Sequence, residues 1–318
     1  MGFLIVLMAD GRVFCRGANT TGECGVGVLT SVPTFAQVPL PQRALQVTAG
    51  TRHVCALLED RSVACWGSMT PTGFEGPPEI RSTPVVIGGL TGVVRVEAGA
   101  FSACALGSEG EVSCWGHNYA GQLGDGTRNA SERPVRVTLS ARAVALDAGG
   151  NLACVLQSDR RVQCWGSLME PTAIVGEDPT RPGILPVPFA VVDLSVGHGG
   201  LCLRDDAGVV HCRGYLAAHN ALEFSPAPRP SAVSALSVGQ YFTCARLEDA
   251  TVSCWGYNGT GMLGGDGLVV HGVGGFRDAV SVHAGAGGAC MVRRGGTLWC
   301  WGRSPGLTTL SPVLVAAP

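Results

Sequence analysis

Residues 44–67 read Ala-Leu-Gln-Val-Thr-Ala-Gly-Thr-Arg-His-Val-Cys-Ala-Leu-Leu-Glu-Asp-Arg-Ser-Val-Ala-Cys-Trp-Gly. This stretch contains three short apolar runs separated by turn residues, and it has no helical period, so it predicts β-strands. The segment between Cys55 and Cys65 is centred on Asp60, which predicts a tight hairpin with the two cysteines opposite each other. Facing residues on adjacent antiparallel strands have Cα atoms about 4.5 to 5.5 Å apart, which is within disulfide range. We therefore predict an all-β unit that can close a local disulfide.

This unit recurs along the whole chain. Its last cysteine begins a Cys-Trp-Gly triplet in five copies and a Cys-Arg-Gly triplet in two. These cysteines are Cys15, Cys65, Cys114, Cys164, Cys212, Cys254 and Cys300, and the steps between them are 50, 49, 50, 48, 42 and 46 residues. Periods of this size are typical of propeller blades. We predict one all-β domain over 1–318, a seven-bladed β-propeller, with repeat units of approximately 1–43, 44–92, 93–142, 143–190, 191–233, 234–278 and 279–318.

Five further cysteine pairs share the spacing of Cys55 and Cys65. They are Cys104 with Cys114, Cys154 with Cys164, Cys202 with Cys212, Cys244 with Cys254, and Cys290 with Cys300. A disulfide across so short a loop would stabilise the fold by roughly 2 to 3 kcal/mol on the chain-entropy model. The alternative is that reduced cysteines fill the blade cores as small apolar side chains. Six recurrences at one spacing favour disulfides, which indicates an extracellular, periplasmic or cell-envelope location.

The composition excludes several classes of function. The chain has 24 acidic and 22 basic residues without a block of like charge, so it lacks the electrostatic signature of nucleic-acid or anionic-membrane binding. All basic residues are arginine, which excludes a P-loop lysine and a lysine Schiff base. The apolar run 2–8 is too short to span a bilayer, and it lacks the basic flank and cleavage site of a signal peptide. We predict a strand there.

Motifs for catalysis or metal binding are absent from the sequence. It contains no Gly-x-Ser-x-Gly, no His-Glu-x-x-His, no Cys-x-x-Cys and no calcium loop, so we expect no catalytic residues, no metal and no cofactor. His211 lies beside Cys212, but neighbouring side chains on a strand point to opposite faces, which favours a packed or rim histidine over a metal ligand. The tryptophans of the triplets share one repeat position that neighbouring blades cover, which favours core packing over carbohydrate stacking.

A glycine-rich loop follows several of the triplets. It is best preserved at 118–127, with weaker copies at 19–27 and 258–264. A phosphate-binding loop needs a helix N-terminus behind it, whereas a β run containing Pro134 follows here. We interpret these loops as structural, with glycines supplying positive φ.

The succession of Val-x-Ala-Gly, His-x-Cys-Ala-Leu, Val-x-Cys-Trp-Gly-x-Asn and Gly-Gln-Leu-Gly-Asp-Gly resembles the regulator of chromosome condensation repeat family, and most of all its bacterial variety with two cysteines per repeat. The resemblance covers essentially the whole chain and implies a seven-bladed β-propeller. The founder of the family is an exchange factor for a small GTPase and binds chromatin, using a basic tail and an inserted wedge, and neither is present here. The family histidine occurs only at His53, and the equivalent residues are Ser102, Leu152, Gly200, Phe242 and Gly288. The exchange-factor role therefore does not carry over residue by residue.

The first repeat is shorter than the others. Ile5-Val6-Leu7 aligns with Cys55-Ala56-Leu57, so the unit begins at its second strand, and we predict a first blade without its inner strand. We expect an upstream segment to supply that strand. Ile5 also occupies the place where Cys15 would find its partner. Either Cys24 pairs with Cys15, or both are buried thiols.

The turn after each inner strand is where the repeats differ most. Successive turns alternate faces, so this turn opens on the same face as the glycine-rich loop. Its candidate partner-binding residues, which we call the rim residues, are Arg52, Phe101, Asn151, His198 and Tyr241. Arginine and aromatic residues are favoured in protein-interface hot spots, although unconstrained turn residues would also vary between repeats.

From these observations we predict a non-catalytic propeller that is secreted or in the cell envelope and binds a protein of unknown identity. We expect a monomer or a module of a longer chain, with no nucleic-acid binding and no membrane insertion. One alternative, by family analogy, is a guanine-nucleotide exchange or regulatory protein for a small GTPase, which predicts an intracellular location and reduced thiols. Another is a module of a larger surface protein or a protein inhibitor.

Overall fold

The computed structural model describes residues 2–69, 80–168, 178–214, 221–227, 233–304 and 307–316. These residues form antiparallel β-sheets joined by loops, and among them only Val273–Gly275 forms a short 3-10 helix. The chain divides into two compact units, Met1–Pro186 together with Pro318, and Val187–Ala317. We call these unit 1 and unit 2.

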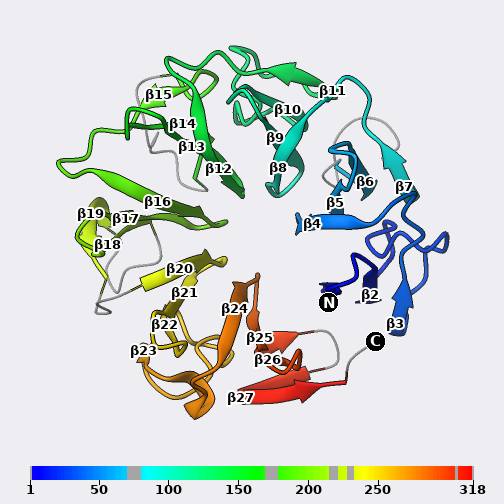
Figure 1. Ribbon diagram of the computed structural model, residues 1–318, viewed down its shortest axis with the longest axis vertical. Helices are drawn as coiled ribbons and strands as arrows, with labels where there is room; N and C mark the ends of the chain where they lie inside the picture. Colours follow the sequence, from blue (N-terminus) through cyan, green and yellow to red (C-terminus); the bar gives the residue numbers. More distant parts are fainter. Residues whose placement is uncertain are drawn as a thin grey trace. The chain divides into compact units, whose positions relative to one another are not determined.

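Unit 1 contains four sheets, each with its strands in sequence order (Figure 1). The first has three strands, β1 (Phe3–Leu7), β2 (Val13–Gly17) and β3 (Val32–Gln37). The second has β4 (Ala44–Ala49), β5 (His53–Leu58), β6 (Val63–Gly67) and β7 (Arg81–Val86). The third has β8 (Val93–Ala98), β9 (Ser102–Gly107), β10 (Val112–Gly116) and β11 (Ser131–Arg136). The fourth has β12 (Ala143–Gly149), β13 (Asn151–Gln157), β14 (Val162–Ser167) and β15 (Gly183–Ile184).

Unit 2 contains three sheets of four strands (Figure 1). They are formed by β16 (Val191–Val196), β17 (Gly200–Asp205), β18 (Val210–Gly214) and β19 (Ala221–Pro226); by β20 (Val233–Val238), β21 (Phe242–Leu247), β22 (Val252–Gly256) and β23 (Val269–Val270); and by β24 (Ala279–Ala284), β25 (Gly288–Arg293), β26 (Leu298–Ser304) and β27 (Leu307–Val315).

Seven successive meander sheets are the blades of the all-β, seven-bladed β-propeller that the repeats predict. We number the sheets blade 1 to blade 7 and call the first strand of each four-stranded blade its inner strand. That the seven blades make one domain, with the repeat boundaries given above, stays a prediction.

The central hairpin of a blade follows from a short acidic turn. In blade 2, the Asp60 carboxylate accepts the backbone N–H of Ser62 at 3.0 Å, and Arg61 adopts a positive φ of 67°. Asp159 and Asp249 accept the equivalent N–H in blades 4 and 6. These turns place the paired cysteines opposite each other in blade 2 and in the five other blades with the same spacing, so the predicted register is confirmed.

The tryptophans of the triplets lie in the core. The side chains of Trp66, Trp115, Trp165, Trp255 and Trp301 are at most 1% exposed. Three of their indole groups also donate a hydrogen bond to a backbone carbonyl in the glycine-rich loop of the preceding blade. These bonds run from Trp66 to Glu23 at 2.9 Å, from Trp165 to Gln122 at 3.1 Å and from Trp301 to Met262 at 2.8 Å. The prediction of core packing is therefore confirmed, and each of these loops joins two blades.

Blade 1 has three strands among the described residues, as predicted. Its β1 pairs with β2 in the register that β5 and β6 adopt in blade 2, with Ile5 opposite Cys15 where Cys55 faces Cys65. All of β1 is half-buried, whereas all of β5 is buried. The difference follows from the inner strand β4, which covers β5.

Candidate functional site

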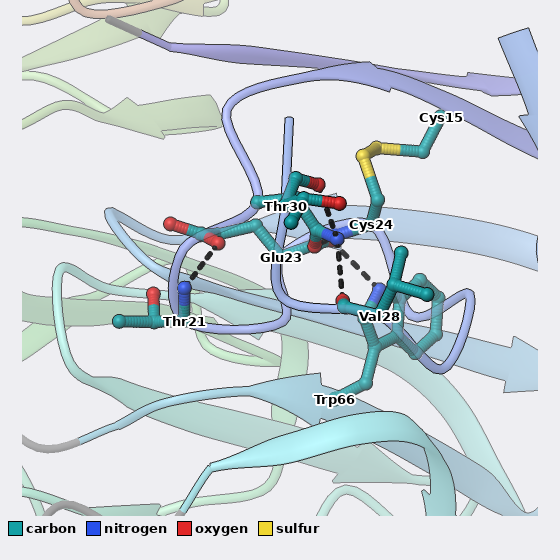
Figure 2. Close-up of a disulfide and its surroundings, with 8 residues drawn as sticks. Cys15, Thr21, Glu23, Cys24, Val28, Thr30 and Trp66 are labelled. Atoms are coloured by element: carbon teal, nitrogen blue, oxygen red, sulfur yellow. Dashed lines mark hydrogen bonds between the residues drawn. A yellow bond between two sulfur atoms is a disulfide. The ribbon is translucent and has the colours of Figure 1, made fainter. Parts of the chain in front are cut away.

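All fourteen cysteines are paired, and six of the seven disulfides join the partners that the spacing predicts. The seventh joins Cys15 to Cys24, with Cα atoms 5.2 Å apart, and so decides between the two alternatives for blade 1 (Figure 2). It connects strand β2 to the glycine-rich loop instead of closing a hairpin.

The glycine-rich loops are organised by one asparagine each. In the loop of blade 1, Asn19 donates to the carbonyls of Val28 at 2.6 Å and Thr30 at 3.2 Å, and its side-chain oxygen accepts the Cys24 N–H at 2.8 Å. Asn118 and Asn258 make the equivalent contacts in blades 3 and 6. A Cβ atom on Gly25, which has a φ of 66°, would lie 2.7 Å from the Trp66 ring. These loops are structural, as the sequence predicts, because they pack against the next blade.

In unit 1, two rim residues lie on adjoining turns and the third begins the strand after the next turn. The backbone N–H of Thr51 donates to the Ala100 carbonyl at 3.0 Å, and the N–H of Ala100 donates to the Gly150 carbonyl at 2.6 Å, so the turns are tied together. Arg52, Phe101 and Asn151 are half-buried. Asn151 differs from the sequence interpretation in one respect, because it is the first residue of β13 and not part of a turn.

The same turns contact the loops that follow the third strands. The carbonyl of Arg52 accepts the N–H of Ser68 at 2.8 Å, and the carbonyl of Phe101 accepts the N–H of His117 at 2.9 Å. These contacts are consistent with the prediction that the turn after the inner strand and the loop after the third strand open on the same face of a blade.

Tyr119 extends this surface, and the sequence analysis did not select it. Its side chain is 49% exposed, and its hydroxyl accepts a hydrogen bond from the Asn151 amide at 2.8 Å. Gln122 donates to the Asn151 side-chain oxygen at 3.2 Å, and Arg128 donates to the Tyr119 carbonyl. Only the position of Tyr119 beside Asn118, in the best-preserved loop, could have drawn attention to it. Tyr119 and Asn151 together link the loop of blade 3 to the start of β13.

A hollow of about 690 Å³ adjoins Tyr119 between blades 2 and 3. The described residues that line it include Trp66, Met69, Arg81, Trp115, Tyr119 and Arg128. Between blades 1 and 2, the glycine-rich loop of blade 1 lies against Trp66. Between blades 3 and 4, the glycine-rich loop of blade 3 lies against Trp165 in the same way. The loop that follows β6 includes residues 70–79, which lie outside the described residues.

In unit 2, the rim residues are His198 and Tyr241. His198 lies in the turn between β16 and β17, and its burial lowers the pKa of its imidazole. Tyr241 lies in the turn before β21, and its ring meets that of Tyr257 edge to face, with centroids 6.3 Å apart. Tyr257, which directly follows β22, is 55% exposed, and Tyr241 is half-buried.

The remaining histidine of interest, His211, packs beside an acid and an aromatic ring. Its Nε2 lies 2.8 Å from Asp205 Oδ2, and its ring stacks on Phe189 with centroids 4.0 Å apart. Within the described ranges, no three histidine, cysteine or acidic side chains are grouped so as to hold a metal ion. The same ranges contain no helix with the length and apolar character needed to cross a membrane.

Known repeat families were compared with the sequence of this chain. Two models of the "Regulator of chromosome condensation (RCC1) repeat" match the chain, one over residues 45–70, 93–122 and 233–261, the other over residues 10–57 and 109–156. These segments are similar to RCC1 repeats. The match confirms the resemblance seen in the sequence, although it gives no indication of a bacterial origin.

Individual known proteins resemble this chain in a short stretch of sequence or in fold. The protein Pim1 of Schizosaccharomyces pombe is 30% identical over 108 residues, which span 27% of this chain and 20% of Pim1. Yeast RCC1 (Prp20), solved bound to Kap60, superposes with a TM-score of 0.83 at 17% identity, covering 98% of this chain and 85% of Prp20. A second structure, of Prp20p from Saccharomyces cerevisiae, described with its binding properties to Gsp1p and histones, gives a TM-score of 0.75 at 19% identity, covering 89% and 78%. At such identities the structural likeness shows the fold alone.

Proposed function

We propose that this chain is a non-catalytic RCC1-type propeller of an oxidising compartment, outside the cell or in its envelope, and that it binds a protein partner through the rim residues. The observation that carries the proposal is the surface of unit 1, where backbone hydrogen bonds tie the turns of Arg52 and Phe101 to each other and to Gly150, and Asn151 binds the half-exposed side chain of Tyr119. Arginine and tyrosine are enriched at the centres of protein interfaces because each provides a large contact area together with hydrogen bonds.

The disulfides support the choice of compartment. All seven cysteine pairs are joined, and every one of these cysteines except Cys290 is buried. Cytosolic reductants keep thiols reduced, so seven bridges favour an oxidising compartment. Alkylation of the native protein without a reductant, followed by mass spectrometry, should label no cysteine. Labelling at most of the pairs would contradict an oxidising compartment.

Affinity capture from the envelope fraction of the native cells tests the rim residues. Two variants of the full chain are used, one changed in unit 1 and the other in unit 2. One variant carries Arg52→Ala with Phe101→Ala in unit 1, and the other carries His198→Ala with Tyr241→Ala in unit 2. The control carries Val86→Ala with Arg133→Ala, two exposed positions on the outer strands β7 and β11. We expect a partner retained by the control to be lost from the unit 1 variant. Equal capture by the control and both rim variants would remove the rim as the binding surface.

A second candidate function is regulation of a small GTPase. It is favoured by the structure of Prp20p, whose description states binding to Gsp1p and histones. This function requires an intracellular protein, so the alkylation result separates it from the first proposal. A nucleotide-release assay with a small GTPase from the same cells provides a direct test.

A further inference from the structure

The inner strands carry polar side chains at one equivalent position, directly opposite the first cysteine of each blade. In unit 1 these residues are Thr48, Glu97 and Asp147 on β4, β8 and β12. In unit 2 they are Ser195, Ser237 and His283 on β16, β20 and β24.

A hydroxyl at this position joins neighbouring inner strands. The Thr48 hydroxyl accepts the backbone N–H of Ala98 at 3.1 Å. In unit 2, Ser195 accepts the N–H of Val238 at 3.2 Å, and Ser237 accepts the N–H of Ala284 at 2.9 Å. On β8 and β12 the equivalent residues are acids, so carboxyl groups stand where other blades have a hydroxyl.

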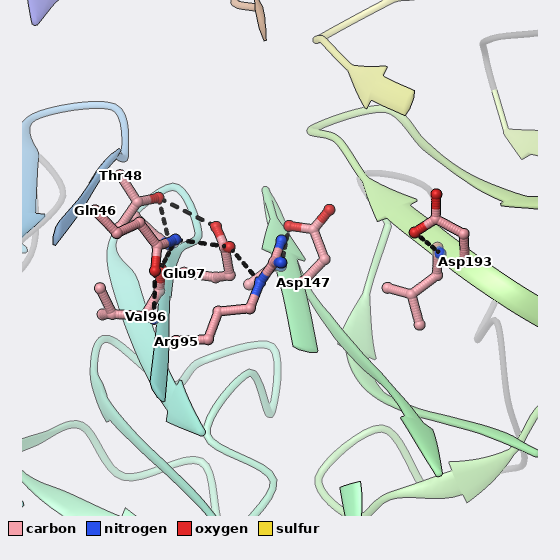
Figure 3. A network of polar contacts seen from close by, with 10 residues as sticks. Gln46, Thr48, Arg95, Val96, Glu97, Asp147 and Asp193 are labelled. Atoms are coloured by element: carbon pink, nitrogen blue, oxygen red, sulfur yellow. Dashed lines mark hydrogen bonds and ion pairs between the residues drawn. The ribbon is translucent and has the colours of Figure 1, made fainter. Parts of the chain in front are cut away.

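Glu97 is held by donors from two inner strands (Figure 3). Its Oε1 accepts the amide of Gln46 at 3.0 Å and the Nε–H of Arg95 at 2.7 Å, and Thr48 donates to its Oε2 at 3.4 Å. The Gln46 side chain also bonds both backbone groups of Val96, at 2.7 and 3.1 Å. Gln46 and Thr48 thus bind the Glu97 carboxyl and the backbone of β8 at the same time.

Two carboxyl groups, those of Glu97 and Asp147, lie beside one guanidinium in this cluster. Glu97 is 12% exposed, and Asp147 on β12 adds a second carboxylate against the single guanidinium of Arg95, which is 46% exposed. The packed strands β4, β9 and β13 carry no group that titrates, and His53 on β5 stays neutral because burial lowers its pKa to about 4. Burial first, and then the charge of Asp147, raise the pKa of Glu97 to about 8 although Arg95 opposes the shift.

We propose that Glu97 is a proton-operated latch between the inner strands β4, β8 and β12. With its proton bound, the carboxyl is neutral beside Asp147, and the bonds through Gln46 and Thr48 hold β4 to β8. When the proton leaves for solvent, a second negative charge is buried beside Asp147, and the three strands separate more readily. Because the folded state binds this proton more tightly than the unfolded state does, the stability that Glu97 contributes is fully present below about pH 4.5 and is lost as the pH rises towards 8.

The first test measures the proton directly. Carbon-13 NMR of the side-chain carboxyl groups, with the Glu97 signal assigned by its loss in Glu97→Gln, should give a titration midpoint between pH 7 and 9, because burial and Asp147 raise the pKa of Glu97 to about 8. Asp147→Asn should lower that midpoint, since it removes the neighbouring charge. A midpoint below about 5.5 in the unchanged protein, close to an ordinary glutamate, would overturn the proposal.

The second test measures the latch. In urea unfolding, the unfolding equilibrium constant of the unchanged protein should rise at least about tenfold between pH 6 and pH 9, against about twofold or less for Glu97→Gln. Amide exchange at Val96 and Ala98, corrected for intrinsic rates, should accelerate over the same range and stay slow in the variant. Glu109→Gln, an exposed site in the turn of the same blade, is the matched control and should follow the unchanged protein. The same pH dependence in Glu97→Gln as in this control would overturn the latch.

Discussion

Blades 1 and 2 have the same central hairpin but different surroundings. β1 and β5 pair with the next strand in one register, yet β5 is buried along its length and β1 is half-buried. The disulfide of blade 2 closes the hairpin, whereas that of blade 1 anchors a loop. The repeat sequence therefore determines the hairpin, and the presence of an inner strand such as β4 determines how deeply the hairpin is buried.

The largest effect is expected from truncating matched leucines. Leu57 on β5 is 2% exposed, and Leu7 occupies the equivalent place on β1 but is half-buried. Leu57→Ala should cost about 4 kcal/mol of the unfolding free energy because it leaves a cavity, and Leu7→Ala about 1 kcal/mol. Urea unfolding of the two variants measures the difference. Equal losses would show that the covering strand does not distinguish the blades.

Removal of the two disulfides should instead show the blades to be alike. Cys15 and Cys24 are 9 residues apart, and Cys55 and Cys65 are 10 apart. Because chain entropy depends on loop length, replacing either pair by alanine should cost about 3 kcal/mol. Thermal unfolding of both double variants provides the measurement. A much smaller loss for the first pair would mean that Asn19 alone holds the loop.

Blades 1 and 2 should also differ in how acid affects their stability. His53 on β5 is fully buried, and burial lowers the pKa of its imidazole to about 4, whereas β1 has Phe3 at that position. The folded state binds this proton less tightly than the unfolded state does, so the stability it contributes is present above about pH 6.5 and is lost as the pH falls towards 4.

Between pH 7.5 and pH 5 the loss should be about 2 kcal/mol, and His53→Phe should remove it. Urea unfolding at both pH values, with Phe3→His as the reciprocal variant, measures the effect. An unchanged slope in His53→Phe would assign the acid sensitivity to other groups.

The smallest effect concerns the bond that joins the two blades. Trp66 donates its indole N–H to the Glu23 carbonyl at 2.9 Å. Trp66→Phe keeps an aromatic ring but removes the donor, and should cost about 1 kcal/mol for the hydrogen bond, besides any loss of packing. Trp165→Phe, which removes the equivalent bond to Gln122, should match it within error. A double-mutant cycle with Asn19→Ala would show whether the loop and the ring act together.

Local features of this fold could be predicted from the sequence, and contacts between repeats could not. The hairpin turn at Asp60 and the facing of Cys55 and Cys65 depend on eleven consecutive residues, so a single sequence determines them. The bond from Asn151 to Tyr119 and the cluster of Glu97 with Gln46 join residues 32 and 51 positions apart. Such pairs depend on how one blade packs on the next, and residue types alone do not reveal that geometry.

The pairing of Cys15 with Cys24 shows the same limit. The repeat identifies Cys15 as lacking its usual partner, but it offers no preference between a bridge and two thiols, because Cys24 belongs to a loop with its own conformation. The hydrogen bonds of Asn19 shape that loop and bring Cys24 to β2.

The short span of every disulfide has a consequence for biosynthesis. Each cysteine is bonded to its immediate neighbour in the order of the fourteen cysteines, and the bonded partners are 9 or 10 positions apart. Closing so short a loop costs less chain entropy than any competing pairing across repeats. A chain that enters an oxidising compartment from its N-terminus can therefore complete each bridge before the next repeat arrives, and needs little reshuffling of wrong bridges afterwards.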